Sequence, residues 1–246
     1  MGRVPRRTTH RRRSDRSQRR GSTATTATTP TTRRGKATRA ALIRAGRYIF
    51  ERDGFLEARI TDIAAAADAA TGSFYSYFDS KQAVFSAVID MVSDDEGLHP
   101  PSMAFLADAC DDLAAGHDPG SGHDLAADVA AHHREWLRHY LRNARLMSVM
   151  EEVTHISDEF RRHRIEAAQP FMDANAEAVR CLQTAGLADP ALDPLQTARS
   201  LSTMVSRSAF VAFVLEEEGE DALDVLVTTL TLLWLNALRI PVDPGV

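Results

Sequence analysis

Residues 60–81 read Ile-Thr-Asp-Ile-Ala-Ala-Ala-Ala-Asp-Ala-Ala-Thr-Gly-Ser-Phe-Tyr-Ser-Tyr-Phe-Asp-Ser-Lys, and this stretch decides the fold class. The pattern predicts a short helix over residues 62–67, a tight turn over 68–70 and a second short helix over 71–77. Two helices joined by a short turn form the unit that places its second helix in the major groove of DNA. The N-terminal part of the chain is therefore predicted to bind DNA.

Polar residues mark where the neighbouring helices begin and end. Thr61 is expected to cap the first short helix, and Ser80 to cap a following helix that starts at Lys81. Before the stretch, apolar side chains at helical spacing predict a longer helix over residues 38–53. Gly54 ends that helix, because glycine readily adopts the left-handed conformation of a C-terminal cap.

Three segments in this order resemble the tetracycline-repressor (TetR) family of transcriptional regulators. They are residues 42–55, which end in Ile-Phe-Glu-Arg-Asp-Gly-Phe, residues 60–64, Ile-Thr-Asp-Ile-Ala, and residues 72–81, Gly-Ser-Phe-Tyr-Ser-Tyr-Phe-Asp-Ser-Lys. An ordered set of this kind is far more specific than a bare helix-turn-helix. The chain departs from the family pattern at three residues, where alanine, a turn glycine and a Ser or Thr cap are usual: Gly46, Asp68 and Ala70.

The resemblance implies an all-α protein. A three-helix helix-turn-helix DNA-binding domain would span residues 38–97, and a helical ligand-binding and dimerisation domain would span residues 98–241. Residues 1–37 are arginine-rich and threonine-rich, and we expect them to form a disordered basic arm. The resemblance further implies a bacterial, cytoplasmic protein that acts at the nucleoid, most often as a repressor, with no cofactor.

The expected DNA contacts are short polar or glycine residues at the recognition helix, tyrosines that follow them, and the starts of two helices. Small side chains there would reach base edges, tyrosine hydroxyls would reach phosphate, and a helix N-terminus favours an anion. Tyr75 and Tyr77 could also be ordinary half-buried aromatics, but their place beside Gly72 and Lys81 favours the DNA role. The predicted contacts are Thr61, Thr71, Gly72, Ser73, Tyr75, Ser76, Tyr77 and Lys81.

The charge of the chain is unevenly distributed. Residues 1–40 hold 13 basic residues and one acidic residue, whereas the other 206 residues hold 16 basic and 33 acidic residues. Such an arm favours a polyanionic partner, so a DNA-coating structural protein is the alternative to a sequence-specific regulator. An enzyme is disfavoured, because the chain has no nucleophile elbow, P-loop, dinucleotide fingerprint or zinc-helix motif.

The C-terminal half is predicted to be helical and rich in apolar stripes. The resemblance implies double-stranded operator DNA, a small-molecule effector and a second copy of the chain as partners. The last two helices, over residues 194–218 and 220–239, would form the homodimer or fill the core of the subunit. Leu230 and Trp234 lie one turn apart and are expected to be buried together. The effector stays unidentified, and candidate pocket residues, which could equally be plain core, are Trp136, Tyr140, Met147, Met150, Phe171, Met172 and Met204.

Three further sequence features received an interpretation. His132, Glu135 and His139 share a helical face, but a solvated polar face is favoured there over a metal site completed by His155 or His163. Cys110 and Cys181 are expected to be small buried thiols in a reducing compartment rather than a disulfide. No run of 18 apolar residues predicts a membrane span, and the N-terminus lacks the apolar stretch of a signal peptide.

Overall fold

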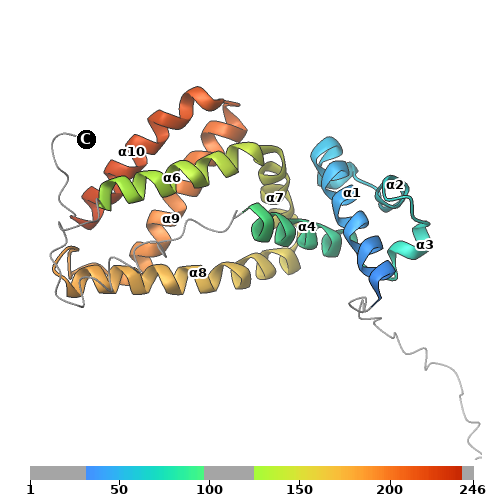
Figure 1. Ribbon diagram of the computed structural model, residues 1–246, viewed down its shortest axis with the longest axis horizontal. Coiled ribbons are helices and arrows are strands. Elements are labelled where there is room, and N and C mark those ends of the chain that lie inside the picture. Colours follow the sequence, from blue (N-terminus) through green and yellow to red (C-terminus); the bar gives the residue numbers. More distant parts are fainter. Residues whose placement is uncertain (1–31, 97–124, 240–246) are drawn as a thin grey trace, which may run out of the picture.

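The computed structural model describes residues 32–96 and 125–239, and every regular element within these ranges is a helix (Figure 1). The N-terminal helices gather at one end of the molecule, and the later helices form a longer bundle beside them. The helices are α1 (Arg33–Glu57), α2 (Ile60–Ala66), α3 (Thr71–Phe74), α4 (Lys81–Glu96), α6 (Leu125–Arg142), α7 (Ala144–Ile156), α8 (Asp158–Thr184), α9 (Pro194–Phe210), the π-helical turn η1 (Val211–Leu215) and α10 (Glu220–Leu238).

The first helix starts earlier and ends later than predicted. Thr32 caps α1, its hydroxyl oxygen accepting a hydrogen bond from the Gly35 amide at 3.1 Å, so Arg33 and Arg34 lie in its first turn rather than in a disordered arm. Gly54 adopts φ +75°, the left-handed conformation predicted for it. The chain then makes one more helical turn to Glu57, which residue spacing alone did not predict.

A cluster of aromatic rings joins the DNA-binding helices to the rest of the molecule. Phe50 stacks on Phe55 with ring centroids 5.6 Å apart, and both rings pack against Phe85 of α4 at 5.1 and 5.6 Å. Phe85 also contacts Phe160 of α8, at 5.2 Å. All four side chains are buried, so the core of the N-terminal helices continues into the C-terminal bundle.

The C-terminal bundle is built from two packed pairs of helices, α6 with α10 and α8 with α9. Leu230 and Trp234 of α10 are each 2% exposed, which confirms that they are buried together. They face the core of their own subunit, where the Trp234 ring packs edge-on against His133 of α6 at 5.4 Å. The apolar stripe of α9 is buried in the same core. Helix α8 continues through Pro170.

One expectation about the C-terminal half needs correction. Cys181 is disulfide-bonded, not a free thiol, and the other cysteine of the chain, Cys110, lies outside the described residues. Sequence spacing could not show this, because a disulfide depends on how close two residues come in space. Helix α10 is long and apolar enough to cross a membrane by length and composition, although its apolar residues are interrupted by threonines. One such helix is weak evidence of a membrane span, because core helices pass the same test.

Candidate DNA-binding surface and effector cavity

The recognition helix α3 is shorter than predicted and has no side-chain cap. It covers Thr71–Phe74, and the predicted remainder forms a turn in which the Tyr77 amide donates to the Phe74 carbonyl at 2.9 Å. Ala70 holds the N-cap position without a capping hydrogen bond. Asp68 closes the preceding turn. Its φ of +52° lies in the left-handed region, where glycine is the usual residue. Two of the three departures noted in the sequence, Asp68 and Ala70, therefore lie at the start of this helix.

The structure places most of the predicted DNA-contacting residues on one accessible surface. The side chains of Ser73 and Tyr77 are half-buried. Tyr75 is 51% exposed, and its ring lies edge-on to the ring of Phe74. No atom lies within 4 Å of a Cβ built on Gly72, so the start of α3 is open for close approach by a ligand. The fully exposed members of the set are Thr61, Thr71, Gly72, Tyr75 and Ser76.

Thr61 does not cap α2. The helix starts two residues earlier than predicted, and Arg59 is its N-cap, with its carbonyl accepting from the amides of Asp62 and Ile63 at 3.1 Å each. Thr61 lies in the first turn, where its hydroxyl donates to Asp62 at 3.3 Å. The cap differs because the backbone turns at Arg59, directly after the buried Ala58, and not at Thr61, which has the better capping side chain.

Lys81 has a different partner from the one predicted. Its ammonium donates hydrogen bonds to the carbonyls of Phe55, Leu56 and Ala58, at 2.5, 3.0 and 2.9 Å. Three donors thus meet three carbonyls at the end of α1, where a helix favours a cation. Burial lowers the pKa of this ammonium. The side chain holds the α1–α2 connection, which favours a structural role, and its contact with DNA phosphate stays an untested prediction.

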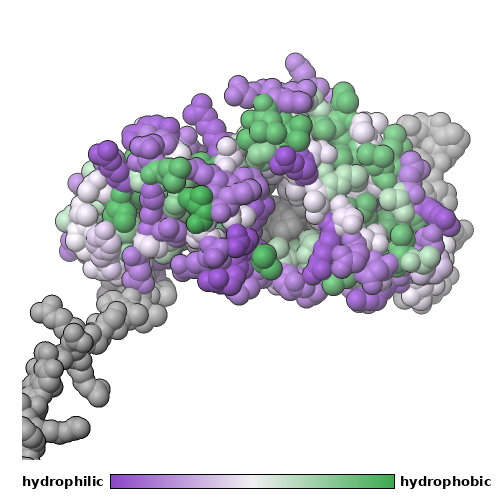
Figure 2. Space-filling view, turned by 180° about the vertical axis from the view of Figure 1, so that it is seen from behind, coloured by the Kyte–Doolittle hydropathy of each residue, from purple (hydrophilic) through white to green (hydrophobic). Residues whose placement is uncertain are grey.

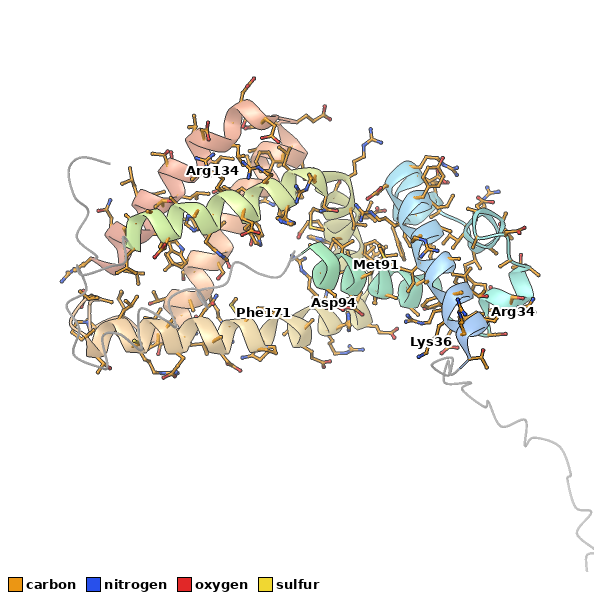
Figure 3. The ribbon with its side chains drawn as sticks, viewed as in Figure 1. Arg34, Lys36, Met91, Asp94, Arg134 and Phe171 are labelled. Atoms are coloured by element: carbon orange, nitrogen blue, oxygen red, sulfur yellow. The ribbon has the colours of Figure 1, made fainter. Side chains whose placement is uncertain are left out.

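A cavity of about 890 Å³ lies among α4, α6, α7, α8 and α9, and Figure 2 shows the surface hollowed near the middle of the molecule. Figure 3 shows Asp94 at the end of α4, above α8, and Phe171 further along α8. Six of the seven candidate pocket residues line the cavity, namely Trp136, Tyr140, Met147, Met150, Phe171 and Met172. The seventh, Met204, packs against the core instead.

The polar wall of this cavity was not predicted from the sequence. Helix α9 contributes polar side chains that recur at helical spacing beside its buried apolar stripe. The same helical spacing of polar residues is visible in the sequence and could have indicated this wall, whereas the predicted pocket residues were methionines and aromatic residues. The α9 residues that line the cavity are Arg199, Ser202, Thr203, Ser206, Arg207 and Phe210.

Comparison with known proteins shows which family of regulators the chain is similar to. Residues 42–88 match the family described as bacterial regulatory proteins, tetR family. The HTH-type transcriptional regulator EthR of Mycolicibacterium smegmatis is 26% identical over 204 residues, which cover 83% of this chain and 87% of EthR. The chain thus matches the TetR family in its DNA-binding helices and resembles a regulator of this family over most of its length. The N-terminal helix-turn-helix and the helical C-terminal bundle of the chain have the architecture of this family.

Solved structures of low sequence identity share the fold of this TetR regulator. One is Thermus thermophilus FadR, a TetR family transcriptional repressor in complex with lauroyl-CoA, with a TM-score of 0.53 and 23% identity over 85% of this chain and 98% of FadR. Another is SmeT, the repressor of the Stenotrophomonas maltophilia multidrug efflux pump SmeDEF, with a TM-score of 0.57 and 21% identity over 85% of this chain and 94% of SmeT.

Helix α7 connects the cavity of this TetR regulator to its DNA-binding helices. Glu152 Oε2 accepts a hydrogen bond from the Phe55 amide at 3.2 Å. At the other end of the helix, Arg47 of α1 donates to Asn143 Oδ1 at 2.8 Å. Between these two contacts, Met147 and its neighbours on α7 line the cavity. Helix α7 therefore contacts both the cavity and α1.

The histidines of this regulator do not form a metal centre in the described part of the chain. No group of three or more His, Cys, Asp or Glu side chains that could hold a metal ion occurs there. Glu135 and His139 approach within 3.9 Å, but His155 bonds to the Glu151 carbonyl and His163 to Asp90 at 3.0 Å. The two histidines proposed to complete a site, His155 and His163, thus bond to other groups in the described chain.

Proposed function

We propose that this TetR regulator is a homodimeric repressor that a small, largely apolar effector releases from a palindromic operator. One observation carries the proposal: α7 forms part of the wall of an apolar cavity and is hydrogen-bonded to α1 next to the recognition unit. An effector that binds one arrangement of the cavity better than another would shift the population between DNA-competent and DNA-incompetent states.

The DNA contacts are proposed on the exposed side of α3 and its neighbours. Thr71 and Ser73 would read base edges, and Tyr75, Ser76 and Tyr77 would bind phosphate, with Thr61 at the start of α2. Arg34 and Lys36 support this orientation, because both are exposed at the start of α1 and lie at the end of the molecule that carries α3 (Figure 3). Their positive charge suits a phosphate backbone.

The dimer is proposed to form mainly through the outward face of α10. Val225 is 67% exposed, Leu232 37% and Leu233 48%, so apolar side chains of α10 reach the surface. Figure 2 shows hydrophobic side chains gathered over the C-terminal part of the surface. Apolar patches of this kind mark interaction sites, and a symmetric pair of α10 helices would bury them.

Sedimentation of two variants tests the dimer. Leu232→Glu combined with Leu233→Glu places charge on the exposed face, so we expect a folded monomer that binds the operator weakly. Leu230→Asp combined with Trp234→Asp instead buries charge in the subunit core and is expected to unfold the protein. A wild-type protein that sediments as a monomer at micromolar concentration while binding a palindrome tightly would refute the proposed dimer.

The effector role is tested by release from the operator. The cavity volume of about 890 Å³ lies within the range of small-molecule sites, and the fold is shared with a FadR crystallised with lauroyl-CoA. The operator is first recovered from genomic fragments that the full chain retains. Lauroyl-CoA and other apolar compounds are then titrated against the complex. Release by at least one compound supports the proposal, and unchanged operator affinity across the panel contradicts it.

A further inference from the structure

One polar group in the cavity wall, the hydroxyl of Tyr140, has no hydrogen-bond partner among the described residues. Tyr140 of α6 is 5% exposed, and its ring packs against Trp136 at 5.1 Å and Phe213 at 6.4 Å. Its hydroxyl makes no hydrogen bond to any residue in the described ranges, although Tyr140 lines the cavity. The hydroxyl is therefore open to the cavity, where a bound molecule could accept its hydrogen bond.

The charged groups near this hydroxyl leave a positive charge on one wall. Glu151 is neutralised by Arg164 at 2.9 Å. Similarly, Asp90 pairs with His163 at 3.0 Å. Arg207 of α9 stacks on Phe210 with its guanidinium carbon 4.7 Å from the ring centroid. It has no salt bridge to an acid among the residues that the structure describes.

We propose that the Tyr140 hydroxyl and the Arg207 guanidinium bind the carboxylate of a long-chain carboxylic acid, whose apolar chain fills the cavity. The inference rests on the proposed function of this cavity as the effector site. A carboxylate accepts hydrogen bonds at both oxygens, and here each oxygen would meet one donor. The methionine and aromatic side chains on α6, α7 and α8 supply an adaptable apolar surface for the chain.

Electrostatics around Tyr140 support a donor role for its hydroxyl. Burial, followed by the nearby charge of Glu151, raises the pKa of Tyr140, so the hydroxyl keeps its proton at neutral pH. A cationic amphiphile is the alternative ligand, and it would use Asp94, an exposed acid at the end of α4 on the opposite wall. The two other cavity acids, Asp90 and Glu151, already bond to His163 and Arg164.

Calorimetric titration of the full-length protein tests the subsite. The probes are straight-chain carboxylic acids of graded length, the alcohols of the same lengths, and a trimethylammonium amphiphile of matching chain. The variants are Tyr140→Phe and Arg207→Gln, with Tyr48→Phe and Arg145→Gln as matched controls on exposed residues outside the cavity. Thermal unfolding of each variant confirms that it is folded.

We expect the acids to bind at least about tenfold more tightly than the alcohols, because a hydrogen bond to a charged group contributes about 1.5–3 kcal/mol. Tyr140→Phe and Arg207→Gln should each remove most of this preference and leave alcohol affinity unchanged, whereas the controls should retain it. Equal affinity for acids and alcohols, tightest binding of the cationic probe, or no binding of any acid would overturn the subsite. Preferential acid binding that leaves operator affinity unchanged would uphold the subsite and refute the effector role alone.

Discussion

The side chain of Glu152 in α7 accepts a hydrogen bond from the backbone amide of Phe55 at the end of α1, with Oε2 and N 3.2 Å apart. The carbonyl of the same Phe55 accepts from the Lys81 ammonium at 2.5 Å. One peptide segment thus links the cavity helix α7 to the start of α4. Since Gly54 adopts a left-handed conformation just before it, this segment is also a bend in the backbone of α1.

Glu152→Ala should weaken the communication between cavity and operator. Loss of the acceptor frees the Phe55 amide from α7, so a ligand-induced shift of α7 would move α1 less. Coupling of this kind commonly changes affinity about 5–150-fold, and we expect the variant to lose much of that factor. Operator affinity is measured with and without saturating effector, using Glu166→Ala on the exposed face of α8 as the control. An unaltered coupling factor would show that the Glu152 contact carries no signal.

Lys81→Met should destabilise the fold without changing the salt dependence of DNA binding. The variant keeps the apolar stem and loses three hydrogen bonds to carbonyls, at a cost of about 1–3 kcal/mol in the free energy of unfolding, since the group is partly solvated. Urea denaturation measures that loss. In contrast, Lys36→Met should leave stability unchanged and reduce the slope of log affinity against log salt by about 1 per subunit. A reduced slope for Lys81→Met would instead support its predicted contact with phosphate.

Gly72→Ala separates folding from DNA recognition. A Cβ at this position meets no atom within 4 Å in the free protein, and Gly72 has no positive φ, so the free energy of unfolding should be maintained or raised slightly. Operator affinity should fall, because the added methyl group stands between α3 and the duplex. Gly219→Ala, equally open but at the start of α10, is the matched control. If both variants bind the operator like the wild type, close approach at Gly72 is not required.

His133 should make the stability of the bundle depend on pH. It is 1% exposed and hydrogen-bonded through Nδ1 to the Thr231 hydroxyl of α10 at 3.0 Å. Burial, and secondarily His132, lowers its pKa from 6.5 to about 4. The unfolded chain therefore binds a proton between pH 6.5 and 4 while the folded chain does not, so stability falls as the pH decreases through this window.

The size of that effect can be bounded and measured. The pKa difference corresponds to at most roughly 3 kcal/mol, lost by the time the pH reaches about 4. Urea unfolding at pH 7 and pH 5 should show a smaller decrease for His133→Gln than for the wild type. The exposed His155→Gln serves as control and should behave like the wild type. An identical decrease in His133→Gln and wild type would place the pH dependence elsewhere.

Much of the fold follows from helical periodicity and from a few backbone signals. The Ser80 hydroxyl caps α4 as predicted, accepting from the Ala83 amide at 3.0 Å, and Gly54 bends the chain where its lack of a side chain allows it. Six cavity residues were found because methionine and aromatic side chains on neighbouring helices tend to share one interior. These signals are local, or depend on which face of a helix is apolar.

Contacts between distant segments could not be predicted in this way. The partners of Lys81 lie 23 to 26 residues earlier in the chain, and they exist only because α4 returns to the end of α1. Likewise, the apolar residues of α10 surround the helix, so sequence could not separate the buried Leu230 from the exposed Leu233. Packing of α10 against α6 and α9 decides which face is inward.

The central claim is that this TetR regulator recognises a specific DNA sequence, and one ratio tests it most directly. The affinity of the full-length protein for the recovered operator is compared with its affinity for random DNA of the same length, at one physiological salt concentration. We predict a ratio of at least about 10³, as specific DNA-binding proteins show. A ratio near one would contradict the account and indicate a protein that coats DNA through its basic arm without reading sequence.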